Sequence, residues 1–355
     1  MDTNSLLVQE NNMGLFHNRD QAGSTSGVPV WFMRQAGRYH DHYQGIKAKS
    51  DFMTMCKDPK LAHDVTMGPI EEFDFDAAIL FSDLLFPLEY LGMGLVYKPG
   101  PILGMKISDM SSIFELKPQG NPEDFYQFQK EATKLLRASL PNSKTLLGFV
   151  GAPWTLYAYA VEGGHAGNLI DAKKGLYDGR WTQFLERLMP GLLTEMILQA
   201  EGGADAVCIF DTAAGELDRY HYEKYIIPEL RKQCMNFKRL HPETKIVYYS
   251  KHTHMDYLKA IECEAIDVLG IDWRMNLPQA LKELGPDYMI QGNFDPSLLH
   301  LEWEHVEAGL ERLWQSVQGQ DLSRWIMGLG HGVLPLTPQE NVKKAVAYIH
   351  KNFRY

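Results

Sequence analysis

Two arginines four residues apart stand out in the stretch PVWFMRQAGRY, residues 29–39. Arg34 and Arg38 follow an apolar run, and the residues between them are Gln35, Ala36 and Gly37. A cation at the end of a buried element is costly to desolvate, so each guanidinium needs an anionic partner. Because the planar fork of arginine binds carboxylate oxygens in a bidentate manner, the pair predicts a site for a carboxylate-bearing ligand. Ion pairs with internal carboxylates such as Asp83 or Asp211 are the alternative.

Other residues able to do chemistry also follow short apolar runs. They are Asp83, Trp154, Tyr157, Tyr159, Asp211, Thr212, Ser250, Lys251, His252, His254, Asp272, Arg274, Asn293, Asp295 and His331. A carboxylate accepts hydrogen bonds, tyrosine can donate one, and histidine suits acid–base work near neutral pH. For four of these residues a structural role competes, and for Trp154 and Tyr159 that role is packing within a helix. Asp83 or Ser82 could cap the following helix, and His331 could be a buried structural histidine.

Metal, nucleophile and phosphate sites receive little support from the residue pattern. His252, His254 and His331 could give the three protein ligands of a zinc site, but their spacing is loose. No G-x-S-x-G occurs, and no cysteine follows an apolar run in a histidine-rich setting. The glycines of VEGG and GLGHG are not followed by the Lys-Ser/Thr pair of a phosphate-binding loop.

These residues need elements that bring them to one place. Eight apolar runs alternate with amphipathic stretches, at residues 28–33, 76–81, 145–151, 205–210, 245–249, 265–271, 288–292 and 324–330. Eight strand–helix units predict a single (β/α)8 TIM barrel, with a doubly wound sheet as the rival. In a barrel the active site lies at the carboxyl ends of the strands, where the polar residues fall.

The domain boundaries follow from the same pattern. Residues 1–27 are polar and predict an N-terminal leader, partly disordered or with a short helix at SLLVQE, and residues 28–355 form the barrel catalytic domain. The gap of about 60 residues between the second and third strands leaves room for an excursion. In that gap KPGPILG, residues 98–104, indicates irregular structure.

Composition restricts the class of protein. The formal net charge of −10 argues against nucleic-acid or anionic-membrane binding, so a bound anion must meet a local cluster of cations. The four cysteines are far apart without C-x-x-C, which favours a reducing compartment. No run is long and apolar enough for a membrane helix, and no secretory signal is visible. We therefore expect a cytoplasmic location.

Four motifs together carry a family resemblance. PVWFMRQAGRY, FSDLL, GAPWTL with VEGG, and GLGHG occur in this order, and the chain resembles the uroporphyrinogen decarboxylase family from about residue 28 onward. The resemblance implies a (β/α)8 barrel, a homodimer, and neither cofactor nor metal. It implies lyase activity in haem biosynthesis. The substrate would be uroporphyrinogen, a tetrapyrrole whose four acetate side chains lose carbon dioxide to give coproporphyrinogen.

The resemblance also assigns roles. It implies catalytic roles for Asp83, Arg34, His331 and Tyr159, and substrate binding by Arg34, Gln35, Ala36, Gly37, Arg38, Lys47, Asp83, Tyr159, Phe210, Thr212 and His331. Asp83 would accept the four pyrrole N–H groups and stabilise positive charge on the ring. The proton donor stays open between Arg34, whose pKa is ordinarily very high, and His331.

The chain also departs from the family pattern. Where the family commonly reads LPEYR after RQAGRY, residues 40–44 read HDHYQ and Lys47 follows. The basic GKGP stretch is shortened to KPGP, and His252 replaces an acidic residue or glycine. These changes alter the carboxylate-binding collar. Two alternatives therefore stay open, a zinc- and corrinoid-dependent methyltransferase of the same superfamily and a tetrapyrrole-binding protein without activity.

Overall fold

A sheet of seven parallel strands forms the centre of the computed structural model, which describes residues 14–16 and 27–354. The strand order is β1-β4-β5-β6-β7-β8-β9, so within this sheet the strands lie side by side in the order in which they occur along the chain. Their bounds are β1 Ala77–Ile79, β4 Thr145–Gly151, β5 Ala206–Asp211, β6 Lys245–Ser250, β7 Val268–Gly270, β8 Met289–Phe294 and β9 Trp325–Leu329. Each lies within or overlaps a predicted apolar run, so seven of the eight predicted strands are confirmed.

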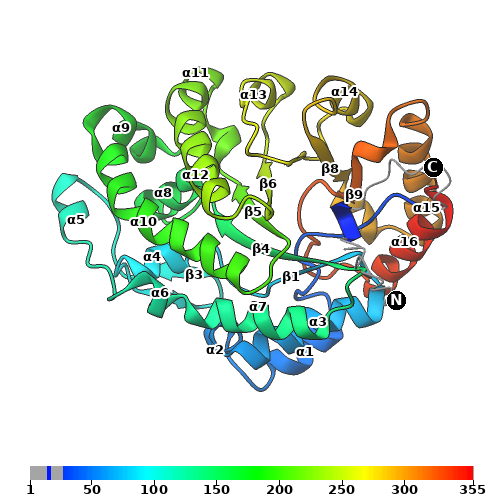
Figure 1. Ribbon diagram of the computed structural model, residues 1–355, viewed down its shortest axis with the longest axis horizontal. Helices are drawn as coiled ribbons and strands as arrows, with labels where there is room; N and C mark the ends of the chain where they lie inside the picture. The colour runs from blue at the N-terminus through cyan, green and yellow to red at the C-terminus, as the bar shows by residue number, and fades with distance from the viewer. Residues whose placement is uncertain (1–13, 17–26, 355) are drawn as a thin grey trace, which may run out of the picture.

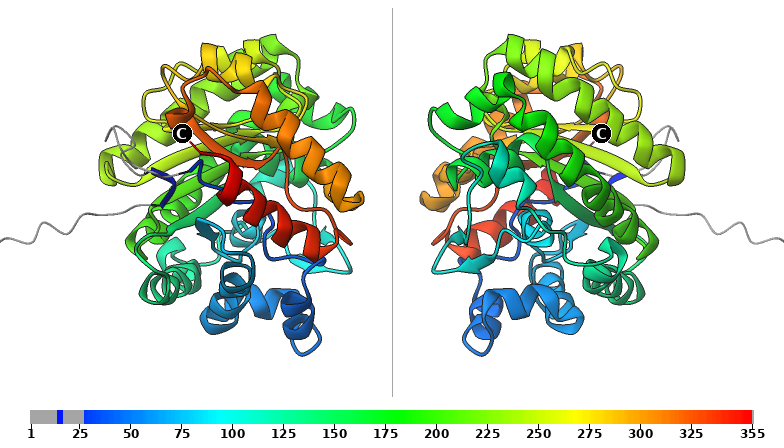
Figure 2. Two further views of the ribbon diagram at one scale, coloured as in Figure 1. Left: turned by 90° about the vertical axis from the view of Figure 1, so that its right-hand side faces the viewer. Right: turned by 90° about the vertical axis from the view of Figure 1, so that its left-hand side faces the viewer.

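Helices surround the strands (Figure 1; Figure 2). The sheet is curled, and the arrangement is TIM-barrel-like; a doubly wound sheet would need a strand order that reverses. The α-helices are α1 Asp41–Lys47, α2 Phe52–Lys57, α3 Pro59–Phe73, α4 Phe86–Tyr90, α5 Met110–Phe114, α6 Pro122–Phe125, α7 Gln127–Ser139, α8 Pro153–Glu162, α9 Ile170–Asp178, α10 Arg180–Glu201, α11 Arg219–His221, α12 Ile227–Leu240, α13 Met255–Lys259, α14 Leu277–Glu283, α15 Trp303–Ser316 and α16 Gln339–Asn352. Short 3₁₀ or π turns are η1 Gly14–Phe16, η2 Ala214–Glu216, η3 Tyr222–Ile226, η4 Pro296–His300 and η5 Leu322–Arg324.

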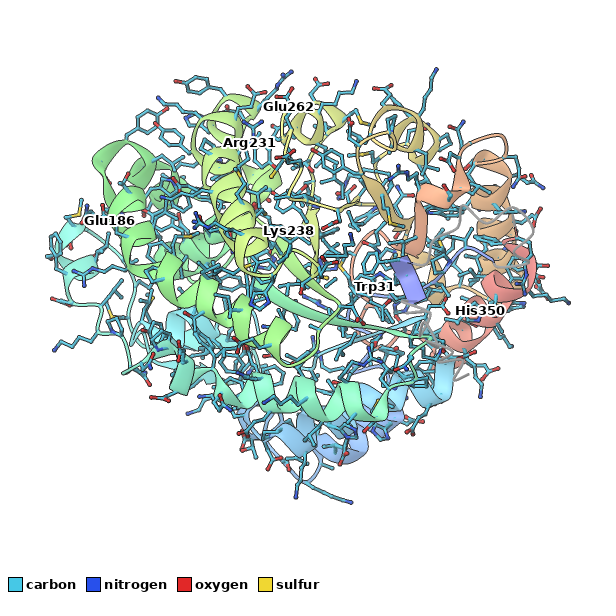
Figure 3. The ribbon with its side chains drawn as sticks, viewed as in Figure 1. Trp31, Glu186, Arg231, Lys238, Glu262 and His350 are labelled. Atoms are coloured by element: carbon cyan, nitrogen blue, oxygen red, sulfur yellow. The ribbon has the colours of Figure 1, made fainter. Side chains whose placement is uncertain are left out.

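The predicted first strand, residues 28–33, is not a regular strand. Val30 makes only an isolated parallel bridge to Met327 of β9. Pro29 has no N–H to donate, and the Val30 N–H donates to the Asp76 carboxylate at 2.7 Å instead of to a neighbouring strand. His350 on α16, labelled in Figure 3, contacts the same carboxylate oxygen at 3.0 Å. The segment is therefore held to β9 and to the start of β1 by few backbone bonds.

The strands are buried on both faces, as in parallel sheets covered by helices. On β5, Val207 and Ile209 pack among the residues that face the helices, whereas Ala206, Cys208 and Phe210 pack inside the curled sheet. The inner cluster comprises Leu15, Trp31, Met33, Ala77, Leu147, Ala206, Cys208, Phe210, Val247, Tyr249, Val268 and Ile326. This packed interior leaves room for a ligand only at its ends.

The excursion between β1 and β4 contains a hairpin. Strands β2 Leu95–Tyr97 and β3 Pro101–Leu103 pair in antiparallel register, with Tyr97 opposite Pro101. The expectation of irregular structure at residues 98–104 is therefore wrong for β3. The hairpin forms because the turn between its strands contains Pro99 and Gly100, residue types that favour tight turns.

Most of the predicted leader, including the expected helix at SLLVQE, lies outside the described residues. The described part, η1, places Leu15 in the inner cluster, and the Leu15 N–H donates to the Thr145 hydroxyl at 2.8 Å. Among the described residues, no helix has the length and apolar character needed to cross a membrane.

Candidate active site

A cavity of about 610 Å³ opens at the carboxyl ends of the strands. Its wall includes all eleven residues expected to bind substrate, namely Arg34, Gln35, Ala36, Gly37, Arg38, Lys47, Asp83, Tyr159, Phe210, Thr212 and His331. They come from segments up to 297 residues apart, and the curled sheet brings them together. Phe210 belongs to both the cavity wall and the inner cluster, so the packed interior also forms the cavity floor.

The segment carrying the two arginines is fixed by buried contacts. The Gln35 side-chain N–H donates to the Ala77 carbonyl at 3.0 Å, and its amide oxygen accepts from Ile79 N–H at 3.3 Å. The Gln35 side chain thus makes the hydrogen bonds to β1 that a neighbouring strand would otherwise make. Its amide group is therefore bonded to the backbone and is not free to bind a ligand. This anchoring places Arg34, in a left-handed conformation with φ 57°, at the cavity wall.

The absence of a side chain at Gly332 leaves space for the Arg34 side chain, which packs against it. A Cβ atom built on Gly332 would lie 2.5 Å from Arg34 Cδ and 2.6 Å from Cγ. These atoms form the stem of the side chain, so they could not move without moving the guanidinium. The last glycine of GLGHG therefore serves close packing.

The cavity wall carries more positive than negative charge. Arg34, Arg38 and Lys47 line it, against the single carboxylate of Asp83. Among the described residues, none of the three cations forms a side-chain ion pair, so the alternative of internal ion pairs with Asp83 or Asp211 is not realised. In a chain of net charge −10, three cations without ion pairs at one cavity favour an anionic ligand.

Asp211 has a structural role. Its carboxylate is buried and accepts from the Thr155 hydroxyl at 2.7 Å and the Tyr248 hydroxyl at 3.0 Å. Burial raises the pKa of Asp211 to about 6, despite these two hydrogen bonds. The side chain therefore ties the end of β5 to α8 and β6 and does not point at the arginines.

Asp83 lies before α4 and accepts from Leu85 N–H at 2.8 Å. Burial raises the pKa of Asp83, while hydrogen bonds from Tyr97 and Leu85 and the charge of Arg34 act in the opposite direction. Ser82, the competing cap, instead accepts from the Gln129 side chain at 3.0 Å. One Asp83 oxygen thus fixes the turn, and the residue still lines the cavity.

His331 differs from the sequence-based expectation. Burial, reinforced by the charges of Arg34 and Lys251, lowers the pKa of His331 to about 3. In the unliganded protein the imidazole is therefore neutral at pH 7 and holds no proton to give as imidazolium. The expectation of a pKa near neutrality is wrong for this state, because sequence alone does not reveal that two cations face the ring.

Aromatic rings form much of the remaining wall. Phe52 contacts Phe81 and Tyr97, with ring centroids 5.7 and 4.4 Å apart, and Tyr43 contacts Phe81 at 5.8 Å. Across the cavity, Phe149, Phe210 and Tyr249 form a second row. Thr212 also lines the cavity, and its buried hydroxyl has no hydrogen-bond partner among the described residues.

Sequence reasoning missed Tyr97 and His165. Tyr97 reaches Asp83 because the hairpin folds over the cavity, and His165 Nδ1 lies 2.6 Å from the Tyr159 hydroxyl oxygen. Neither contact follows from strand order. The only available signals were the glycine pair 163–164 before His165 and the aromatic residue in the excursion.

Two of the residues that depart from the family pattern, Gln44 and His252, make defined contacts in the structure. The Gln44 side chain donates to the Arg38 carbonyl at 2.5 Å, so it supports the backbone of that arginine. His252 has a left-handed backbone with φ 62°, and its N–H donates to Asp272 at 2.8 Å. Among the described residues no group of three histidine, cysteine or acidic side chains has the geometry of a metal site, and this includes His252, His254 and His331.

Comparisons with known proteins agree with the site. A family model described as "Uroporphyrinogen decarboxylase (URO-D)" matches residues 21–352. A protein named uroporphyrinogen decarboxylase from Geobacter metallireducens is 35% identical over 326 residues, which cover 91% of this chain and 94% of that protein. A protein of the same name from Vesicomyosocius okutanii is 37% identical over 332 residues, covering 92% and 94%.

One solved structure extends the comparison to the fold. A methyltransferase from Methanosarcina mazei superposes with a TM-score of 0.74 at 17% identity, covering 92% of this chain and 95% of that one. At this identity the likeness shows the fold alone. It therefore supports the TIM-barrel-like architecture without bearing on the reaction.

Proposed function

The chain belongs to the uroporphyrinogen decarboxylase family, and we propose that it removes the four acetate carboxylates of uroporphyrinogen III as carbon dioxide to give coproporphyrinogen III. One observation carries the proposal. Three cations without ion pairs and one carboxylate line a cavity with aromatic walls, and the substrate combines an array of carboxylates with four central N–H donors. An apolar cavity with a few convergent polar groups is the usual form of a small-molecule site.

Arg34 and Arg38 would bind substrate carboxylates. Their guanidiniums are free for bidentate contacts, and Lys47 adds a point charge further out on α1. The Phe210 ring and its aromatic neighbours would pack against the pyrroles, and the Thr212 hydroxyl would give one directional hydrogen bond. Gln35, Ala36 and Gly37 would contribute mainly by fixing the arginines at the wall.

Asp83 would accept the pyrrole N–H groups and stabilise the charged intermediate. In each cycle a proton adds to a pyrrole ring carbon, giving an iminium ion. The bond between the acetate methylene and its carboxylate then breaks, its electron pair neutralises the iminium, and carbon dioxide leaves. The exocyclic methylene takes up a proton and the ring carbon loses one, so each acetate consumes one proton and becomes a methyl group. A fixed carboxylate lowers the energy of the cationic state.

The pKa values of the cavity residues favour one proton donor over the others. His331 is neutral in the unliganded protein because burial, reinforced by the charges of Arg34 and Lys251, lowers its pKa. A substrate carboxylate at Arg34 would offset one of the charges that lower the pKa of His331, which favours the imidazole over Arg34 as the proton carrier in the complex. Arg34 is less suited, since guanidinium releases a proton reluctantly. Tyr159, whose pKa is raised to about 12 by burial and Asp83, would keep its proton and donate a hydrogen bond.

We also infer that the segment at residues 28–33 closes the sheet as an eighth strand. Pro29 and Trp31 exchange backbone hydrogen bonds with Met327 of β9, and the Asp76 N–H at the start of β1 donates to the Val30 carbonyl. The chain from residue 28 to its end would then be one (β/α)8 barrel domain. The homodimer and the independence from cofactors, expected from the family, and the cytoplasmic location, expected from the composition, stay predictions.

An anaerobic assay with chemically reduced uroporphyrinogen III tests the proposal. Products are separated by carboxylate number, with and without a chelator. We expect species with seven, six, five and four carboxylates to appear in turn at equal rates in both arms. Binding without any loss of carboxylate would contradict the proposal and favour a tetrapyrrole-binding protein. Activity that disappears with the chelator and returns with zinc would favour a metal-dependent reaction.

A further inference from the structure

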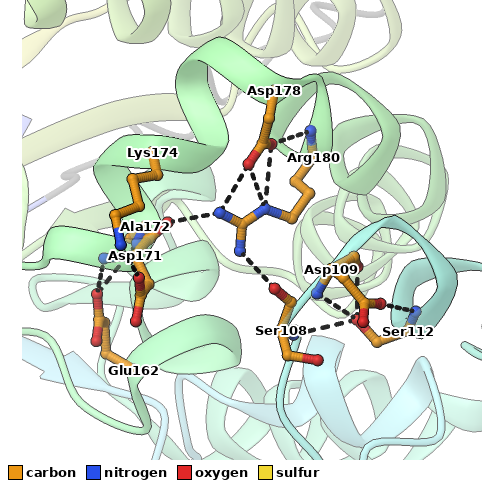
Figure 4. Close-up of polar contacts among 9 residues, drawn as sticks. All are labelled: Ser108, Asp109, Ser112, Glu162, Asp171, Ala172, Lys174, Asp178 and Arg180. Atoms are coloured by element: carbon orange, nitrogen blue, oxygen red, sulfur yellow. Dashed lines mark hydrogen bonds and ion pairs between the residues drawn. The ribbon is translucent and has the colours of Figure 1, made fainter.

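The loop that follows α8 folds back, so that His165 in the loop contacts Tyr159 in α8. Gly163 ends α8 in a left-handed conformation with φ 81°, and Gly167 has φ 94°, which other residue types adopt only with strain. Glu162, the last residue of α8, accepts from the N–H groups of Asp171 and Ala172 at the start of α9, at 2.9 and 3.0 Å (Figure 4). Both ends of the loop are thus held by one carboxylate.

A second group secures the start of α9. Arg180 is buried, pairs with Asp178 at 2.9 Å and donates to the carbonyls of Ser108 and Asp171 (Figure 4). These contacts join α9, α10 and the segment before α5. The position of the loop therefore follows from several elements rather than from its own sequence.

His165 contacts Tyr159 directly. Its Nδ1 atom lies 2.6 Å from the Tyr159 hydroxyl oxygen, with ring centroids 5.1 Å apart. Tyr159 lines the cavity, whereas His165 lies behind it and is half-buried. Burial, Lys251 and Arg34 lower the pKa of His165, and the pKa of Tyr159 is raised to about 12. At pH 7 the two side chains thus share one short hydrogen bond between neutral groups.

The direction of this hydrogen bond decides what the tyrosine can do. If Tyr159 donated to His165, only its oxygen lone pairs would face the cavity, and they would repel a carboxylate. A carboxylate only accepts hydrogen bonds, so a tyrosine that binds it must direct its O–H into the cavity. The hydroxyl oxygen is then free to accept from Nδ1–H of His165.

We propose that His165 is a positioning residue, which donates from Nδ1 to the Tyr159 oxygen and thereby directs the Tyr159 O–H at a substrate carboxylate. This inference rests on the proposed function. It assigns to the loop after α8 a part in substrate recognition, exerted entirely through Tyr159.

The charges that face His165 reinforce this direction once substrate binds. The charged groups are Arg34 and Lys251, and the imidazole of His331, which is neutral at pH 7, also faces His165; all three lie on other segments. Burial lowers the pKa of His165 most, and a carboxylate that pairs with Arg34 at the cavity wall offsets one of the two positive charges that lower it further. A rise in the pKa of His165 favours the form in which Nδ1 can only donate, and so favours the Tyr159 hydroxyl in the recognising direction.

Four variants test the inference by the anaerobic decarboxylation assay: His165→Ala, His165→Asn, Tyr159→Phe, and the double variant with phenylalanine and alanine. We expect His165→Ala to raise KM about tenfold, as for loss of a charge-assisted hydrogen bond. Asparagine carries its Nδ2–H near the place of Nδ1, so His165→Asn should stay within about threefold of the parent. The double variant should match Tyr159→Phe within about twofold, because His165 acts only through the hydroxyl.

His305→Ala is the matched control, since His305 is exposed on α15 and does not line the cavity. Its KM should equal that of the parent. An unchanged KM in His165→Ala, equal losses in the alanine and asparagine variants, or additive losses in the double variant would each overturn the inference. If His165→Ala unfolds the loop, the KM of His165→Asn alone tests the inference. A parent protein without turnover would refute the proposed function and this inference with it, whereas an active parent with an unaffected His165→Ala refutes the inference alone.

Discussion

Gly332→Ala should disable the site while leaving the fold intact. The added methyl group would lie 2.5 Å from Arg34 Cδ, 2.6 Å from Cγ and 3.0 Å from Cβ, whereas ordinary contacts begin at 3.4 Å. The stem of Arg34 must therefore move by about 1 Å, and its guanidinium moves with it. Misplacement of a substrate-positioning group by about 1 Å can cost about 10²-fold in rate. We expect kcat/KM to fall by this amount.

Stability should change less than activity. Overpacking costs about 1–3 kcal/mol, and Gly332 has no positive φ that would add backbone strain. Gly45→Ala in α1 is the control, because a methyl group there meets nothing within 4 Å and alanine favours a helix interior. The assay is the initial rate of carboxylate loss below saturation, beside thermal unfolding of both variants. A folded Gly332→Ala protein with kcat/KM within about threefold of the parent would refute the account of Arg34.

Four further outcomes are expected. Asp83→Asn should abolish most turnover with the fold intact by circular dichroism; unfolding would make Asp83 mainly a structural residue. Arg38→Ala should raise KM about tenfold, whereas Arg239→Ala, exposed on α12, should not; equal KM values would remove Arg38 from the collar. Tyr97→Phe removes a hydrogen bond that lowers the pKa of Asp83, so the acid limb of the pH–kcat/KM profile should move to higher pH, and a downward shift would reverse our sign. Burial raises the pKa of Glu195, so folding takes up a proton and stability falls by up to about 1.4 kcal/mol per unit as pH rises from the unfolded toward the folded pKa. Glu195→Gln should flatten the unfolding free energy against pH in that window, and an unchanged slope would contradict the raised pKa.

Most of the sheet was predictable because its strands are buried on both faces. Runs such as TLLGFVG, which became β4, consist almost entirely of buried residues, and periodicity detects them. The segment at residues 28–33 has the same apolar character, but Pro29 and the Asp76 carboxylate alter its backbone bonding. A propensity-based prediction counts the apolar residues and misses the side chain that takes a backbone N–H.

The site residues were predictable to the extent that they follow strands. Arg34, Asp83 and His331 follow the first, second and eighth apolar runs, and the barrel geometry places them together. Tyr97 and His165 belong to an inserted hairpin and a glycine-bounded loop, whose return to the cavity depends on contacts far along the chain. The lowered pKa of His331 likewise arises from burial and from charges on other segments. These features need the three-dimensional arrangement.

The central claim is that this cavity binds the tetrapyrrole with its N–H groups at Asp83 and its carboxylates at the arginines. A crystal structure with coproporphyrinogen, prepared anaerobically, tests it most directly. We predict the macrocycle between the two aromatic rows, the pyrrole N–H groups within hydrogen-bond distance of Asp83, and carboxylates at Arg34 and Arg38. A tetrapyrrole bound outside the cavity, or bound inside it with the N–H groups facing away from Asp83, would contradict the account.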